Sequence, residues 1–361
     1  MNDTRVAALI SAVWPHIRQD ELAHGNYYDR LAEFITSQLS TASFSSRQAF
    51  GDEHLVSVIA GLRRIRPGQF TRNAATQVLS QGPLKLDEQS VQRHLVLALR
   101  IMLTLNIRSG VSKNRLQTQH KMIYPGPTLW EEETCLSKAL AQHFSSLPSS
   151  PLGDMKSKKI EPNMTMAFLS SNRGVKVRWT SNLSEHLSMD WKSRVISVYE
   201  HKICLWNYLN ASRPCIIPQT ILGEAVDTLN LLFPLNDAPT KAFLRQQRIH
   251  FYGLGNCGRE RCYELAKYEV WRERLANLVD VMSEEPRGTQ QLALSKDGKH
   301  LLNFATFWVA SAVALLTIIS IALGTVQTIY SFKQYSLAVA RACSAPDAAT
   351  SLPRYCPKYC S

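Results

Sequence analysis

Histidine and acidic side chains gather in the second half of the chain, at Glu185, His186, Asp190 and His201. Imidazole and carboxylate groups can act together as general acid and base, or hold a metal ion, if the fold brings them to one place. His186 fits equally well as a hydrogen-bonded residue that orients a turn. We therefore predict no catalytic and no metal-binding residue, and keep as the alternative an enzyme that uses the His186/His201 region.

A glycine-rich segment and a cysteine pair follow. Residues 253–258 match G-x-G-x-x-G, and Asp280 is the acidic residue that a dinucleotide site would need about 20 positions further on. In a dinucleotide site this acidic residue lies at the end of a second strand, but here a predicted helix fills the whole interval before Asp280. Cys257 and Cys262 could form half of a zinc site, for which His250 is the nearby third ligand and a fourth is missing. We predict a loop, free thiols and no cofactor.

The first 146 residues should form a helical region. Apolar residues recur with a helical period over 27–39, 53–62 and 91–107. Charged side chains interrupt the last segment, which indicates a core helix. Thr128-Leu129-Trp130-Glu131 resembles a capping box that opens a helix reaching about Phe144. Residues 147–163, rich in Ser, Pro and Lys, are interpreted as a linker.

Residues 164–300 should form a small α+β module. Short β-branched segments at 164–169, 175–180 and 194–199 predict strands, with a hairpin at the Asn172-Arg173-Gly174 turn. Helices are expected at 219–233 and 239–248, and an amphipathic one at 261–282. The fold class is mainly α, with a helical N-terminal region, a short antiparallel hairpin or sheet and one C-terminal transmembrane helix.

That last helix is predicted at 303–330, since residues 304–330 carry no formal charge. At about 1.5 Å per residue, its first 21 residues span roughly 30 Å, the thickness of a hydrocarbon core. The alternative, a buried core helix of a soluble domain, would normally be shorter. The residues expected to mark the membrane segment are Phe304, Phe307, Trp308, Leu315, Ile318, Gly324 and Tyr330.

The orientation prediction rests on the two ends of the chain. No signal peptide opens the sequence, so we expect the region before the span to stay in the cytosol. Three basic residues precede the span closely and two follow it, which weakly favours the same orientation. Which membrane holds the protein is not indicated.

Cysteines are expected to differ across the membrane. The five before the span should be free thiols in a reducing compartment. A lumenal or exterior tail, residues 331–361, could hold one intrachain disulfide and one odd thiol able to cross-link a partner. A cytosolic tail would instead offer its cysteines for acylation. The candidate disulfide cysteines are Cys343, Cys356 and Cys360.

The net charge of +12 is spread along the chain, which argues against a nucleic-acid partner. The densest basic clusters, 62–66 and 156–159, are interpreted as solvated surface or linker, with attraction to anionic lipid headgroups as a secondary role. The predicted partner is the lipid bilayer. A protein partner, or a homodimer through the span or the tail, is a further candidate, because Ala310/Ala314 and Ser320/Gly324 are small-residue pairs.

Several segments of the second half resemble a known pattern. Residues 177–187 resemble a WT-x-NL-x-(D/E)-HL signature, 217–234 an EET-x-x-TL-x-LLFP block, and 304–309 the YTFWVA opening of a terminal span. In this order, over residues 164–332, they are similar to a family of uncharacterised membrane proteins of filamentous fungi. Ala225 departs from the acidic residue of the pattern. The resemblance implies a single C-terminal span and no established activity.

These observations predict a single-pass membrane-anchored protein of unknown biochemical activity. We expect a non-enzymatic interaction or sensing module. The alternative is a membrane-tethered enzyme that uses the His186/His201 region.

Overall fold

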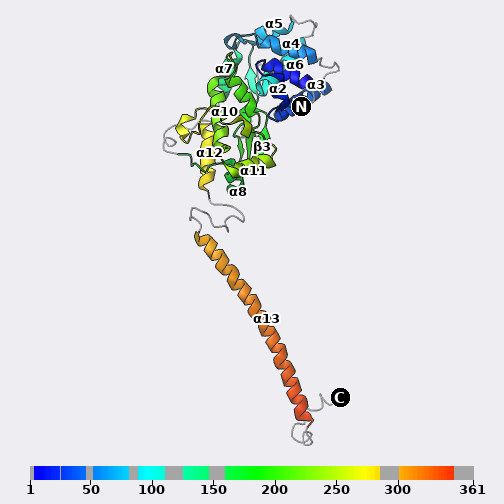
Figure 1. The fold of residues 1–361 in the computed structure, drawn as a ribbon, viewed down its shortest axis with the longest axis vertical. Coiled ribbons are helices and arrows are strands. Elements are labelled where there is room, and N and C mark those ends of the chain that lie inside the picture. Colours follow the sequence, from blue (N-terminus) through cyan, green and yellow to red (C-terminus); the bar gives the residue numbers. More distant parts are fainter. Residues whose placement is uncertain are drawn as a thin grey trace, which may run out of the picture. The chain divides into compact units, whose positions relative to one another are not determined.

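The computed structural model describes residues 4–24, 26–45, 52–80, 88–109, 125–145, 159–284 and 301–344. The chain divides into two compact units, Met1–Pro286 and Arg287–Ser361, which are described separately. The described residues confirm the predicted fold class: helices dominate, a small sheet follows the helical region, and one long apolar helix lies at the C-terminal end (Figure 1).

The first part of the larger unit is helical, as the apolar periodicity predicts. Helix α6 is the core helix expected from its composition, since nine of its residues are buried. Helix α4 packs against α1, α5 and α6, and α5 also packs against α6. The bounds are α1 Thr4–Val13, α2 Gln19–His24, α3 Asp29–Ser45, α4 Asp52–Leu62, the 3-10 helix η1 Pro67–Gln69, α5 Arg72–Ser80 and α6 Glu88–Leu103.

The predicted capping box is wrong. Residues Thr128–Trp130 form strand β2, which pairs in parallel with β1, Ile107–Ser109. The backbone N–H of Thr128 donates to the Asn106 carbonyl at 2.8 Å, so this segment makes sheet-like bonds instead of opening a helix. Helix α7 begins later and spans Leu136–Ser145.

The sheet also differs from the prediction in its connections. Residues Met166–Arg173 form helix α8 and not a strand, because the Thr165 side chain caps its first turn and Gly174 ends it at φ 67°. Strand β3 (Lys176–Thr180) therefore pairs in parallel with β5 (Val195–Tyr199). The antiparallel pair is β4–β5, with β4 at Met189–Asp190. The sheet order is β3-β5-β4.

Helices α10 and α11 agree with the prediction, α12 begins later than predicted, and α9 was not predicted. Residues 261–271 are not part of an α-helix, because Lys159 and Glu264 form a β-bridge and Ile160 N–H donates to the Tyr263 carbonyl at 2.9 Å. The bounds are η2 Leu183–Glu185, α9 Lys202–Leu209, α10 Gln219–Leu232, α11 Ala238–Gln246, η3 Tyr252–Leu254, η4 Leu265–Lys267 and α12 Arg272–Ser283.

Hydrogen bonds join the helical region to the α+β module within this unit. Thr104 Oγ1 and Tyr199 Oη are 2.6 Å apart, and Asn207 Nδ2 donates to Tyr28 Oη at 3.2 Å. Both bonds are buried, so the two regions share one core. Residues 147–158 of the predicted linker lie outside the described residues.

The smaller unit contains helix α13, Leu301–Cys343 (Figure 1). It continues beyond Tyr330, where the predicted membrane helix ends. With 43 residues it is about 65 Å long, roughly twice the thickness of a hydrocarbon core.

Candidate functional site

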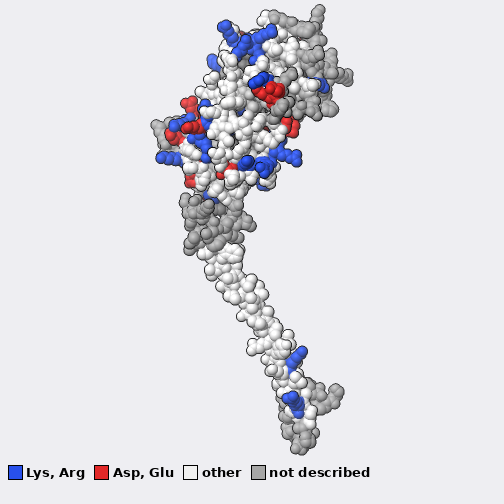
Figure 2. Space-filling view, viewed as in Figure 1, with Lys and Arg blue, Asp and Glu red and all other residues white. Residues whose placement is uncertain are grey.

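Helix α13 exposes apolar side chains on all its faces. Sixteen of the eighteen large hydrophobic side chains that are exposed in the described residues belong to it, and Leu129 and Trp191 are the other two. Figure 2 shows its surface without charged side chains over most of its length. A helix with this length and composition can cross a membrane. Of the predicted membrane residues, Phe307, Trp308, Leu315, Ile318, Gly324 and Tyr330 are exposed, and Phe304 lies on the same helix.

Several hydroxyl groups of α13 donate to carbonyls of the same helix. Thr317 Oγ1 donates to the Val313 carbonyl at 2.8 Å, and Thr328 Oγ1 donates to the Gly324 carbonyl at 2.8 Å. Such bonds remove most of the cost of placing a hydroxyl in hydrocarbon.

Cysteine chemistry differs between the two units. The described cysteines of the larger unit are free: Cys135, Cys204, Cys215, Cys257 and Cys262. Cys343, the last residue of α13, takes part in a disulfide. Cys356 and Cys360 lie outside the described residues, so the pairing within the tail stays a prediction.

His186 is a fully buried histidine with both ring nitrogens engaged. Its Nδ1 accepts the Tyr199 backbone N–H at 3.2 Å, and its Nε2 is 2.7 Å from Thr228 Oγ1. The Thr228 hydroxyl in turn donates to the Ala225 carbonyl at 2.8 Å. Burial lowers the pKa of His186 to about 3, so the ring is neutral at physiological pH. These contacts describe a structural histidine.

Residues from η2, α10 and α12 meet around this ring. Arg274, from α12, donates to the carbonyls of Ser184 and His186. The rings of His186 and Trp271 lie edge to face, with centroids 5.5 Å apart. From α10, the Glu224 carboxylate accepts the backbone N–H groups of Glu269 at 2.6 Å, Val270 at 2.8 Å and Trp271 at 3.3 Å. These contacts therefore hold the start of α12 against η2 and α10.

His201 does not join His186 in a catalytic arrangement. It is buried, neither ring nitrogen has a hydrogen-bond partner, and its ring packs against Phe34 and Tyr199. Its Nε2 is 3.8 Å from the Glu200 carboxylate. Burial lowers the pKa of His201 to about 3. Of the two acidic candidates, Asp190 bonds its own turn at Lys192 and Ser193, and Glu185 accepts from Arg178 and Thr180.

The glycine-rich segment is a loop, as predicted. Its first residues form η3, and no strand lies directly before it in the described structure. Gly255 and Gly258 have positive φ angles of 59° and 67°. A Cβ atom on Gly253 would lie 1.7 Å from Tyr27 Oη, so any larger residue there would have to displace the Tyr27 ring. Among the described residues no group of three His, Cys, Asp or Glu side chains could hold a metal ion.

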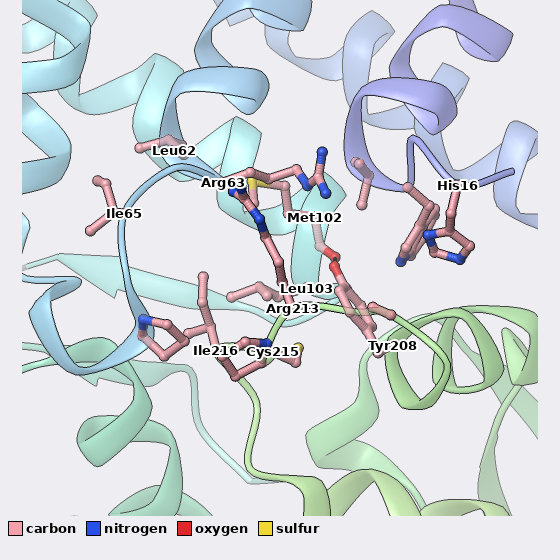
Figure 3. A pocket seen from close by; sticks show the side chains of 15 residues that line it. His16, Leu62, Arg63, Ile65, Met102, Leu103, Tyr208, Arg213, Cys215 and Ile216 are labelled. Carbon is pink, nitrogen blue, oxygen red and sulfur yellow. Dashed lines mark hydrogen bonds between the residues drawn. The ribbon is translucent and has the colours of Figure 1, made fainter.

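A pocket that the sequence did not reveal lies among α1, α4, η1, α6 and the segment after α9 (Figure 3). Its walls are mostly apolar, and it leaves about 60 Å³ for the centres of water-sized spheres. Trp14 and Tyr208 pack edge to face at one side, with ring centroids 5.3 Å apart. The fifteen lining residues include Arg63, Arg213 and His16 but no Asp or Glu.

The two arginines give this pocket its charge. Their side chains lie next to each other in the close-up (Figure 3). Arg63 donates to the Ala12 carbonyl at 3.3 Å, whereas Arg213 makes no hydrogen bond or ion pair with the described residues. Burial lowers the pKa of the Arg63 guanidinium, and the neighbouring charge of Arg213 also lowers it. Arg63 belongs to the basic cluster 62–66, but the sequence alone could not show that Arg213 lies beside it.

Comparisons with protein-family models, with curated proteins and with solved structures found no match for this chain.

Proposed function

We propose that the protein is anchored by one transmembrane helix and presents its larger unit in the cytosol as a non-enzymatic interaction or sensing module. The observation that carries the proposal is the apolar, fully exposed surface of α13. In water this surface would be unfavourable by about 25 cal/mol per Å² of apolar area, and a bilayer removes that cost. The resemblance to single-span membrane proteins of filamentous fungi is part of the same proposal.

Cysteine chemistry supports the orientation. Free cysteines are typical of a reducing compartment, and disulfides persist in an oxidising one. The larger unit has free thiols, and Cys343 at the far end of α13 is disulfide-bonded. We infer that the larger unit faces the cytosol and the end of α13 faces the lumen or the exterior.

The side-chain geometry favours binding over catalysis. Both nitrogens of His186 are occupied, and His201 is shielded by Phe34 and Tyr199. A general base must reach the proton that it abstracts, and neither ring lines the pocket of Figure 3. The alternative enzyme would require both rings to become accessible.

Carbonate extraction and glycosylation mapping test the proposal. Two native sequons of the larger unit have exposed asparagines, Asn163 and Asn210, and should remain unglycosylated. A matched sequon made by Ala348→Asn, with Thr350 as its third residue, should be glycosylated. Glycans on Asn163 or Asn210 would reverse the orientation. Release of the full chain by alkaline carbonate would contradict the anchor itself.

The proposed partners need a separate test. A homodimer linked through an odd tail cysteine would give a dimer band on a non-reducing gel that disappears with reductant. A dimer held by the span alone would survive reductant in a mild detergent and would be cross-linked in membranes.

A further inference from the structure

We propose that the pocket of Figure 3 binds a small anion that carries a short apolar group, such as a short-chain carboxylate or a short alkyl phosphate. This inference goes beyond the membrane anchor and does not depend on which side of the membrane the larger unit occupies. It rests on the shape, the charge and the unused donors of the pocket.

The interior of the pocket selects an apolar group of limited size. Leu62, Ile65, Met102, Leu103 and Ile216 supply aliphatic surface. The cavity leaves about 60 Å³ for the centres of water-sized spheres, so it has room for a short apolar chain. A chain of four carbons fits such a space, whereas a full-length lipid acyl chain does not. The ligand is therefore a small molecule.

The edge of the pocket selects a negative charge. Arg63 and Arg213 are close enough for their charges to repel, and no acidic side chain among the described residues lines the pocket to compensate them. Like charges that approach in a partly buried site are unfavourable, and an anion bound between them converts that repulsion into attraction. Arg213 has all its donors available to the ligand within the described structure.

The guanidinium groups of Arg63 and Arg213 determine which anions can bind in the pocket. Each presents a planar set of N–H donors that matches the oxygens of a carboxylate or a phosphate in pairs. Tyr208 Oη already donates to the Met102 carbonyl, so the tyrosine supplies ring surface and the arginines supply the hydrogen bonds. Carboxylate and phosphate share this chemistry, and the choice between them is left to the experiment.

The experiment uses the full chain in nanodiscs of phosphatidylcholine, whose headgroup has no net charge and cannot compete as an anion. Saturation-transfer NMR measures binding of pentanoate and butyl phosphate, with empty nanodiscs as the blank. Pentanol provides the apolar group without the charge, and acetate and inorganic phosphate provide the charge without the chain. We expect saturable binding of pentanoate, of butyl phosphate or of both, and much weaker binding of the three controls.

Arg213→Gln is the decisive variant, because Arg213 is exposed and its replacement leaves the core intact. Loss of a charged hydrogen-bond donor should raise the Kd about tenfold or more. Arg63→Gln should do the same, with far-UV circular dichroism to verify folding. Arg64→Gln is the matched control: it lies on the same loop, does not line the pocket and should leave the Kd unchanged.

Three outcomes would overturn the proposal. They are equal affinity of pentanol and pentanoate, an unchanged Kd in Arg213→Gln, and absence of saturable binding by both anions. A preference for one anion over the other supports the proposal and identifies the ligand class.

Discussion

His186 and Thr228 lie 42 positions apart in the chain, yet His186 Nε2 and Thr228 Oγ1 are only 2.7 Å apart in the buried core. Because His186 Nδ1 accepts a backbone N–H from Tyr199, the proton of the neutral ring must lie on Nε2. The imidazole thus donates to Thr228, whose hydroxyl donates to the Ala225 carbonyl. One continuous set of hydrogen bonds therefore connects β5, the segment after η2, and α10.

Removing the Thr228 hydroxyl from this set of hydrogen bonds should destabilise the larger unit. Thr228→Val leaves the buried Nε2–H of His186 without an acceptor, which costs about 1–3 kcal/mol. Chemical denaturation of the full chain in detergent, followed by tryptophan fluorescence, measures the change. Thr41→Val, which removes an exposed hydroxyl bonded to the Ser37 carbonyl, should change stability by less than about 0.5 kcal/mol. Equal effects of both variants would contradict the role given to His186.

Acidification should destabilise the protein through its buried histidines. The pKa of His201 is about 3 in the folded chain and 6.5 in the unfolded one, so only the unfolded state takes up the proton as pH falls below 6.5. Stability is therefore lost as the pH falls from about 6.5 towards 3, by about 2 kcal/mol per histidine at pH 5. Glu200 and Arg30 are the charged groups that face this ring.

His201→Phe isolates this effect, because phenylalanine fills a similar space and takes up no proton. Denaturation midpoints at pH 7.5 and pH 5.0 should show a smaller pH-dependent loss for the variant than for the unaltered chain. An identical loss in both proteins would assign the pH dependence to other groups.

Glu224 should be required for the position of α12. Its carboxylate accepts three successive backbone N–H groups at the start of that helix, and burial raises its pKa despite these bonds. Glu224→Gln keeps one oxygen acceptor and loses the charge, so we expect a loss of about 1–3 kcal/mol in the free energy of unfolding. Glu269→Gln, at an exposed neighbouring position, is the control and should have little effect.

Membrane insertion should depend on the centre of the apolar stretch of α13. Ile318→Arg places a charge there at a cost of about 3 kcal/mol on the insertion scale, whereas Ile318→Leu should be neutral. The fraction of chain that resists alkaline carbonate is the measurement. Retention of the arginine variant equal to that of the leucine variant would argue against a bilayer around Ile318.

Thiol alkylation should separate the cysteines into two groups. In denaturant without reductant, the five free cysteines of the larger unit should react, and Cys343 should not. Mass spectrometry of the peptides should show Cys343 labelled after reduction only. Labelling of Cys343 without reductant would remove the cysteine argument for the orientation.

The pairing of the strands in the sheet could be predicted only in part from the sequence. The β-branched segments at 175–180 and 194–199 were correctly predicted as strands. Their parallel pairing could not be read from the chain, because the intervening residues return through η2 and β4 before β5 begins. Residues 164–169 have an apolar pattern that suits either a strand or a helix, and the local bonds of Thr165 and Gly174 decide for the helix.

Composition alone determined that α13 is suited to a membrane, because the transfer of a helix into lipid is a sum over its own residues. The expectation that His186 could serve as a structural residue also came from the sequence, but its partners Tyr199 and Thr228 did not. The ligand pocket was decided by tertiary structure alone: Trp14, Arg63, Met102 and Arg213 come from four distant segments. A cavity and its charge arise from how segments pack, and no local pattern of residues records that packing.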